Sequence, residues 1–143
     1  MVKAVIFDLD GTLLNTLPDL NACVNEALVK FGCPTITTEQ TRQYVGHGGL
    51  RYAQAALPEN KRAQAEYFYK TIYCPILFAC KNQLTKPFDG ESECMDALRA
   101  AGIKLAVVTN KSQEAATELG NTLLAPYGFD VIFGNRDGIP VKP

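Results

Sequence analysis

The chain has 143 residues, of which 47% are hydrophobic and 20% are charged, and its formal net charge is −1. This composition is typical of a soluble globular protein with one domain, or with one small domain that carries an insertion. It argues against nucleic acid or a membrane surface as a partner, because both attract basic patches, and the apolar runs are too short and interrupted to span a bilayer.

The first predicted elements are a strand and a long helix. An apolar run rich in β-branched residues at 2–7 predicts a buried strand, and the polar segment 8–12 follows it. Apolar residues then recur at helical spacing over 17–31, and Asn15 or Thr16 can cap this helix. The chain therefore enters a helical region soon after its first strand.

Three more helical segments follow. Thr37 and Gln40 have the spacing of a capping box, which predicts a helix start. A further helical pattern covers 50–57 and another covers 60–80, where Pro75 should kink or break the helix because proline lacks the N–H donor. This whole stretch is expected to be nearly all helix.

Strands return in the last part of the sequence. A loop at 84–90 leads to a helix at 91–101, whose inner side is predicted to hold Cys94, Leu98 and Ala101. Strands that alternate with helices imply a parallel sheet, in which ligands bind beyond the carboxyl ends of the strands. The remaining predicted elements are strands at 103–108 and 131–133 and a helix from Ser112 to about 124.

Asp8 and Asp10 are the first candidates for chemistry, because they directly follow the first strand. One carboxylate can attack a phosphoryl group, and a second can protonate the leaving oxygen and then deprotonate water. Carboxylates and backbone carbonyls are also the ligands that Mg²⁺ prefers. On this pattern alone an Asp-Gly hairpin turn is about equally good as an interpretation, and the two are compatible.

Thr109, Asn110 and Lys142 are weaker candidates when each is taken alone. A hydroxyl and an amide at a strand end can donate hydrogen bonds to phosphate, but an ordinary helix N-cap explains Thr109 and Asn110 better. A lysine ammonium can hold a phosphate and offset paired carboxylates, but Lys142 alone is better explained as a surface residue. The combination changes this balance, because all of these residues follow successive strands.

Together, the segments 5–13, 107–110 and 141–143 resemble motifs one, two and three of the haloacid dehalogenase superfamily. The helical block between the first two resembles the family's α-helical cap, and the segments 17–31 and 45–49 are most similar to the phosphoglycolate phosphatase branch.

The resemblance implies an α/β fold with a Rossmann-like parallel sheet and an inserted α-helical cap. The core would comprise 1–14 and 83–143, and the cap would comprise 15–82. The implied partner is a small phosphorylated metabolite. The composition, for its part, predicts no role for nucleic acid or membrane, and the cysteine pattern predicts a cytoplasmic protein.

The resemblance also implies the site. Asp8 would be the nucleophile and Asp10 the general acid and base. Mg²⁺ would be held by the Asp8 carboxylate and the Asp10 backbone carbonyl. The implied phosphate-binding residues are Thr12, Thr109, Asn110 and Lys142.

The implied function is Mg²⁺-dependent hydrolysis of a phosphomonoester through an aspartyl-phosphate, with 2-phosphoglycolate as the expected substrate. Another phosphatase of the superfamily and a sugar-phosphate mutase remain alternatives, as does a non-catalytic phosphate-binding or interaction module. The family's fourth, acidic motif is not found in the sequence, so we expect a C-terminally truncated and inactive chain or a naturally shortened homologue.

Some residues have less specific interpretations. His47, in a glycine-rich loop, can contact substrate or be a solvated loop residue. The aromatic cluster 67–69 is expected in the core of the cap. An odd number of cysteines without a CxxC pair argues against disulfides or structural zinc and fits a reducing cytoplasm, with most of them buried. They are Cys23, Cys33, Cys74, Cys80 and Cys94. The N-terminus shows no signal peptide.

Overall fold

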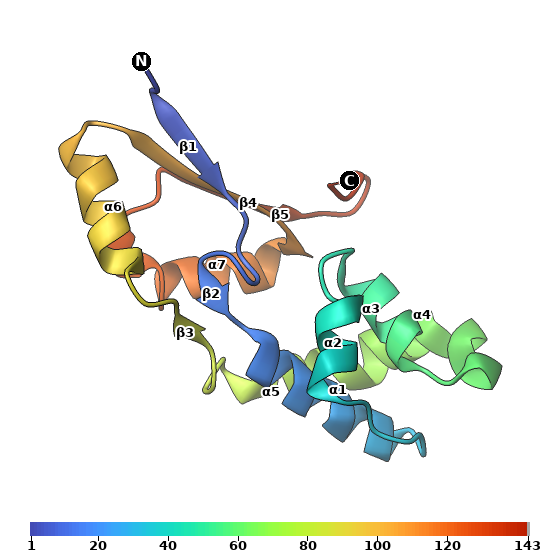
Figure 1. Ribbon diagram of the computed structural model, residues 1–143. Coiled ribbons are helices and arrows are strands. Elements are labelled where there is room, and N and C mark those ends of the chain that lie inside the picture. The colour runs from blue at the N-terminus through green and yellow to red at the C-terminus, as the bar shows by residue number, and fades with distance from the viewer. Residues whose placement is uncertain (143) are drawn as a thin grey trace. The chain divides into compact units, whose positions relative to one another are not determined.

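The computed structural model describes residues 1–142, which form two compact units. One unit comprises Met1–Asn15 with Lys86–Lys142, and the other comprises Thr16–Thr85. Figure 1 shows strands and helices in the first unit and helices in the second. The predicted α/β fold with a helical insertion is therefore confirmed, while the role of the insertion as a cap stays a prediction.

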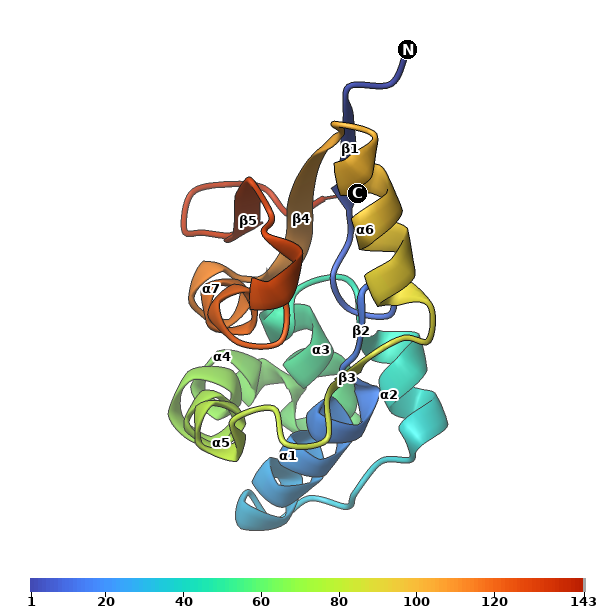
Figure 2. The ribbon, with the colours of Figure 1, turned by 90° about the vertical axis from the view of Figure 1, so that its left-hand side faces the viewer.

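The α/β unit is centred on a three-stranded parallel sheet in the order β1–β4–β5. β4 (Lys104–Ser112) pairs with β1 (Ala4–Phe7) along one edge and with β5 (Val131–Asn135) along the other, as Figure 2 shows. The carboxyl ends of these strands consequently lie at the same edge of the sheet. The other elements of this unit are α6 (Glu91–Ala100), α7 (Gln113–Asn121), η3 (Ala125–Tyr127) and an antiparallel pair, β2 (Leu14–Asn15) with β3 (Lys86–Pro87).

One face of β4 forms the core of this unit. Leu105 and Val107 alternate along the strand and are fully buried, and Met95 of α6 and Leu119 of α7 belong to the same apolar cluster. The predicted inner side of α6 is wrong at Cys94 and Ala101, which are both exposed. Met95, the residue after Cys94, points into the core instead, and Ala101 lies at the C-cap beyond the end of the helix. Because these side chains of β4 are buried, the polar residues at the carboxyl end of the strand are held in a fixed position.

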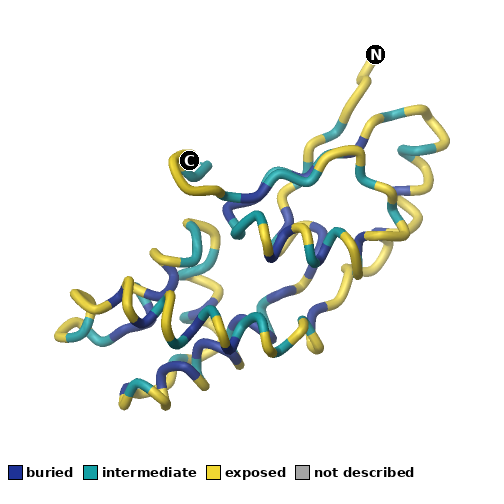
Figure 3. Tube along the Cα trace, turned by 180° about the vertical axis from the view of Figure 1, so that it is seen from behind, coloured by how far each residue is buried: buried dark blue, intermediate teal, exposed yellow. Residues whose placement is uncertain are grey.

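β1 is an edge strand, whereas its composition predicts a buried one. Ile6 is 68% exposed, and Figure 3 colours the strand as exposed and intermediate along its length. Strands of parallel sheets are usually apolar throughout because both of their faces are covered. Within the described residues β1 has only one neighbouring strand, which explains why its apolar side chains remain accessible.

Asp130 anchors the start of β5 to β4. Its carboxylate accepts hydrogen bonds from the Leu105 backbone N–H at 2.9 Å, from Lys104 Nζ at 3.2 Å and from Arg99 at 3.0 Å. These contacts, the backbone hydrogen bond first among them, hold the pKa of Asp130 at about 2. The carboxylate therefore stays ionised at neutral pH and secures the register of the two strands.

Two helix caps were predicted in the helical unit, and the structure confirms one of them in full. The capping box is confirmed: Gln40 N–H donates to Thr37 Oγ1 at 3.1 Å, and Thr37 N–H donates to Gln40 Oε1 at 2.9 Å. Thr16 occupies the N-cap position of the first helix, but its side chain makes no capping hydrogen bond. The elements are α1 (Leu17–Lys30), α2 (Thr38–Tyr44), α3 (Gly49–Ala56), η1 (Glu59–Gln64), α4 (Ala65–Tyr67), η2 (Phe68–Tyr73) and α5 (Cys74–Cys80).

Of the kink or break expected at Pro75, the break does not occur, because the chain stays helical across this residue. η2 is a π-helical stretch directly before α5, and Pro75 occupies the first turn of α5. First-turn residues need no N–H partner within their helix, so the missing donor costs little there. The helix changes from π-helical to α-helical geometry just before the proline, and the chain stays helical.

The core of the helical unit confirms the aromatic prediction in part. Phe68 is fully buried, with its ring 5.4 Å from that of Phe31, whereas Tyr67 is 57% exposed. The prediction that most of the cysteines are buried is wrong, because only Cys23 and Cys33 of the five are. No helix in residues 1–142 is both long enough and apolar enough to cross a membrane.

Asp19 ties the two ends of the helical unit together. Its carboxylate accepts hydrogen bonds from the Leu84 backbone N–H at 3.0 Å and from the Thr85 hydroxyl at 2.6 Å. Both Asp19 and Thr85 are only 3% exposed. These bonds place residues 83–85 with the helices, so the structural unit runs to Thr85 rather than ending at residue 82.

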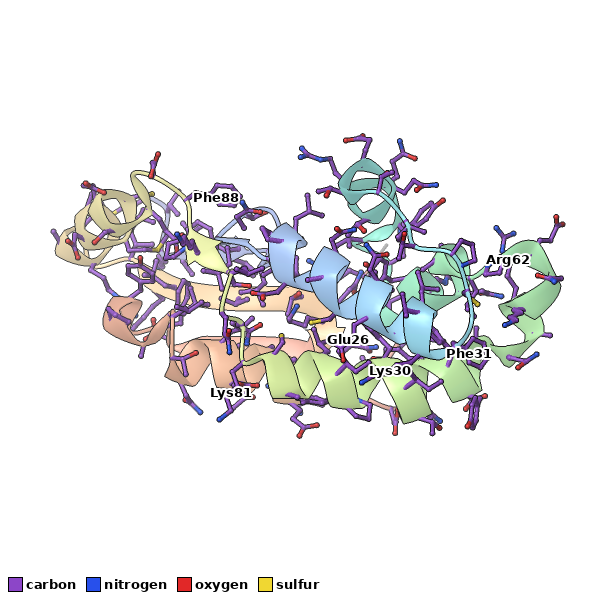
Figure 4. The ribbon with its side chains drawn as sticks, turned by 90° about the horizontal axis from the view of Figure 1, so that it is seen from below. Glu26, Lys30, Phe31, Arg62, Lys81 and Phe88 are labelled. Carbon is purple, nitrogen blue, oxygen red and sulfur yellow. The ribbon has the colours of Figure 1, made fainter. Side chains whose placement is uncertain are left out.

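Replacing Asp19 by alanine is expected to lower the free energy of unfolding by about 1–3 kcal/mol, because the change leaves the buried Thr85 hydroxyl and the partly buried Leu84 N–H without an acceptor. Urea unfolding followed by circular dichroism measures this loss. Glu26→Ala is the matched control on the same helix: Glu26 forms an exposed ion pair with Lys30 at 2.8 Å (Figure 4), worth about 0.3–0.5 kcal/mol. If Asp19→Ala and Glu26→Ala lose equal amounts of unfolding free energy, the Asp19 contacts do not stabilise the helical unit more than an exposed ion pair does.

Candidate functional site

Asp8 and Lys142 meet at the carboxyl end of β1. Asp8 Oδ1 accepts hydrogen bonds from the Leu9 backbone N–H at 2.8 Å and from Lys142 Nζ at 2.9 Å. The side chain of Asp8 is 45% exposed. One oxygen of this carboxylate is therefore fixed, and the group remains accessible to an incoming electrophile. Gly11, with φ at +78°, allows the tight turn that follows.

Asn110 holds Lys142 in place through its backbone. Asn110 Nδ2 donates to the Lys142 carbonyl at 3.2 Å, and Lys142 N–H donates to Asn110 Oδ1 at 2.6 Å. Lys142 Nζ also donates to the Val108 carbonyl at 2.7 Å. Asn110 therefore positions the lysine in this structure. Pro143, the last residue of the third motif, lies outside the described residues.

Thr109 and Asn110 lie within a strand, although their pattern alone resembles a helix N-cap. β4 continues to Ser112, and it is Ser112 Oγ that caps α7 by accepting a hydrogen bond from Ala115 N–H at 3.4 Å. Thr109 is 4% exposed, and its Oγ1 accepts a hydrogen bond from Lys111 N–H at 3.1 Å.

Lys111 is a site residue that the sequence analysis did not identify. Its Nζ donates to Asp10 Oδ1 at 2.9 Å, so that each aspartate of the first motif is paired with one lysine. The residue was overlooked because a helix was expected to start after Asn110. Had the strand been extended, alternation would have placed Lys111 on the same face as Thr109.

One predicted residue of this unit does not join the cluster. Thr12 is exposed, and its side chain makes no hydrogen bond with another site residue in the described part of the chain. His47 belongs to the helical unit, where it lines a hollow of about 460 Å³ together with Arg51 and Arg62.

The chemistry of the donor atoms suits a hard cation. The Asp8 carboxylate and the Asp10 backbone carbonyl are oxygen ligands of the kind that Mg²⁺ prefers, and Mg²⁺ commonly keeps several waters. No group of three or more His, Cys, Asp or Glu side chains that could hold a metal ion occurs in residues 1–142. The two oxygen atoms named above therefore fit a magnesium ion in the type of their donor atoms.

This fold and this arrangement define a class of hydrolase, and comparison with known families agrees. The chain belongs to the family of haloacid dehalogenase-like hydrolases, whose pattern residues 5–143 match. The predicted family resemblance is thus confirmed over nearly the whole sequence.

Several similar proteins carry a more specific name than that of the family. A phosphoglycolate phosphatase of Vibrio parahaemolyticus is 33% identical over 152 residues, covering 99% of this chain and 64% of the relative. One from Pseudomonas fluorescens is 31% identical, with 98% and 53% covered. The crystal structure of a predicted phosphoglycolate phosphatase from Haemophilus somnus 129PT superposes with a TM-score of 0.84 at 26% identity, with 99% and 66% covered. The chain thus spans less than two thirds of these two curated relatives.

Proposed function

We propose that the protein hydrolyses small phosphomonoesters through an aspartyl-phosphate intermediate, with 2-phosphoglycolate as its substrate. The observation that carries this proposal is the pairing of Asp8 with Lys142, in which one carboxylate oxygen is held while the side chain stays 45% exposed. A lysine beside a carboxylate allows a phosphate dianion to approach a negatively charged nucleophile.

The residues divide the reaction into two steps. Asp8 Oδ2 attacks phosphorus, the bond to the leaving oxygen breaks, and Asp10 supplies a proton to that oxygen. Asp10 then takes a proton from water, which attacks the phosphoryl group and releases phosphate from Asp8. Lys142 donates to a phosphoryl oxygen, and the Thr109 hydroxyl is the second donor that we assign to the phosphate.

A magnesium ion would be held by the Asp8 carboxylate and the Asp10 carbonyl, where it would offset the charge of the phosphoryl oxygens. Asp8 and Lys142 nevertheless bind and orient the phosphoryl group through their own contacts. We expect chelation of divalent ions to abolish turnover.

Phosphate release from 2-phosphoglycolate by the full-length protein encoded by the reading frame, with millimolar Mg²⁺, tests this proposal. A panel with glucose 1-phosphate and p-nitrophenyl phosphate separates the alternatives. Conversion of a sugar phosphate to its isomer without phosphate release would indicate a mutase. Saturable binding of phosphate without turnover of any ester would indicate a phosphate-binding module.

A further inference from the structure

Two lysine–aspartate pairs of the site differ in how much water reaches them. The side chains of Lys142 and Asp8 are 34% and 45% exposed, whereas those of Lys111 and Asp10 are 9% and 15% exposed. Both pairs have an N–O distance of 2.9 Å. The first pair is accessible to an incoming anion, but the second is enclosed by protein.

The backbone around Lys111 directs its side chain. Lys111 N–H donates to Thr109 Oγ1, and the pairing of β4 with β5 changes register between Val108 and Ser112. Such irregularities re-aim side chains at strand ends. The ammonium thereby reaches Asp10, a residue 101 positions earlier in the sequence.

We propose that Lys111 is a positioning residue that holds the Asp10 carboxylate at the place from which it exchanges a proton with the leaving oxygen. This inference rests on the proposed function, because it assigns Lys111 a part in the same reaction. Lys111 acts through Asp10 and does not itself contact the phosphoryl group.

The enclosure of this pair is the reason for separating Lys111 from the phosphate ligands. If the Lys111 ammonium moved to a phosphate, it would take its positive charge away from an enclosed carboxylate, and breaking an enclosed ion pair is strongly unfavourable. Lys142 meets no such obstacle because its pair is partly exposed. The site therefore has one lysine for the substrate and one for the general acid.

Lys111→Met in the full-length protein tests the proposal. We expect kcat for 2-phosphoglycolate to fall about 10²-fold, since displacing a reacting group by about 1 Å costs this much, with KM nearly unchanged. The rate of the first step, phosphoryl transfer to Asp8, should fall less with p-nitrophenyl phosphate, whose leaving oxygen needs less help from an acid. The affinity for inorganic phosphate, measured by calorimetry, should stay the same.

Two further variants control for damage to the fold. Lys104→Met removes another lysine of β4, one that is 72% exposed and paired with Asp130, and should leave kcat, KM and phosphate affinity unaltered. Lys111→Arg keeps the charge and should recover part of the lost kcat. Circular dichroism checks that each variant is folded, and Lys111→Arg carries the test if Lys111→Met does not fold.

Each other outcome overturns the inference. Weaker phosphate binding or a raised KM with unchanged kcat would make Lys111 a phosphate ligand. Equal losses in the rate of phosphoryl transfer to Asp8 from both esters, without recovery in Lys111→Arg, would indicate a structural role. If the parent protein hydrolyses no phosphomonoester, the proposed function fails and the positioning role with it, whereas an active parent with an unimpaired Lys111→Met variant refutes the positioning role alone.

Discussion

Asp8→Asn is expected to reduce phosphomonoester hydrolysis by the full-length protein by on the order of 10⁴-fold or more, as loss of a nucleophile does in other enzymes that form covalent intermediates. An amide in place of the carboxylate cannot form an acyl phosphate that water hydrolyses. Asparagine has nearly the same size, and its Oδ1 can still accept the hydrogen bonds from Leu9 N–H and Lys142 Nζ. The fold should therefore be retained.

The measurement combines kinetics with chemical trapping. Acid quenching during turnover should leave a phosphoryl group on the peptide that carries Asp8 in the parent protein and none in the variant. Asp89→Asn, which neutralises an exposed loop carboxylate, is the matched control and should have parental activity. If Asp8→Asn keeps more than about a tenth of the parental kcat, direct attack by water or by another group replaces the covalent route.

Local sequence signals predicted much of the fold, because the interactions behind them are local. The capping box of Thr37 and Gln40 is formed by residues three apart, and the helix predicted at 50–57 begins and ends within one residue of α3. The alternation of strands and helices in the last third of the chain likewise indicated the parallel sheet, since crossover rules leave few topologies.

The differences arise where tertiary contacts decide. Pro75 was expected to kink or break a helix, but the chain stays helical because Pro75 lies in the first turn of α5, where no N–H partner is needed. β1 has the composition of a buried strand, yet its place at the sheet edge depends on which other strands pair with it. The short ribbon of β2 and β3 joins residues more than 70 positions apart and has no local signal.

The candidate site shows the same division. Asp8 and Asp10 could be identified because they follow a recognisable strand, and the family pattern added Thr109 and Lys142. The role of Asn110 as a clamp on the Lys142 backbone depends on contacts 32 positions apart, which no local pattern reports.

Asp10→Asn is expected to lower kcat for 2-phosphoglycolate by about 10²–10⁴-fold, the usual contribution of a general acid and base. Its effect should depend on the step that limits turnover. With p-nitrophenyl phosphate the first step needs little acid, because the leaving oxygen is already a good leaving group. Hydrolysis of the aspartyl-phosphate still needs a base to take the proton from water. The variant should therefore accumulate the intermediate.

Stopped-flow measurement with p-nitrophenyl phosphate tests this directly. Asp10→Asn should release a burst of p-nitrophenol stoichiometric with enzyme, followed by slow steady turnover, and the trapped phosphoryl group on Asp8 should rise in step with the burst. Asp8→Asn should show no burst. Lys111 Nζ lies 2.9 Å from Asp10 Oδ1 in the parent protein. The side-chain amide oxygen of the Asp10→Asn variant can still accept this hydrogen bond, so we expect the variant to fold. If Asp10→Asn turns over both esters at near-parental rates, the general acid is another residue. If turnover is slow but no burst occurs, Asp10 acts before the phosphoryl group reaches Asp8.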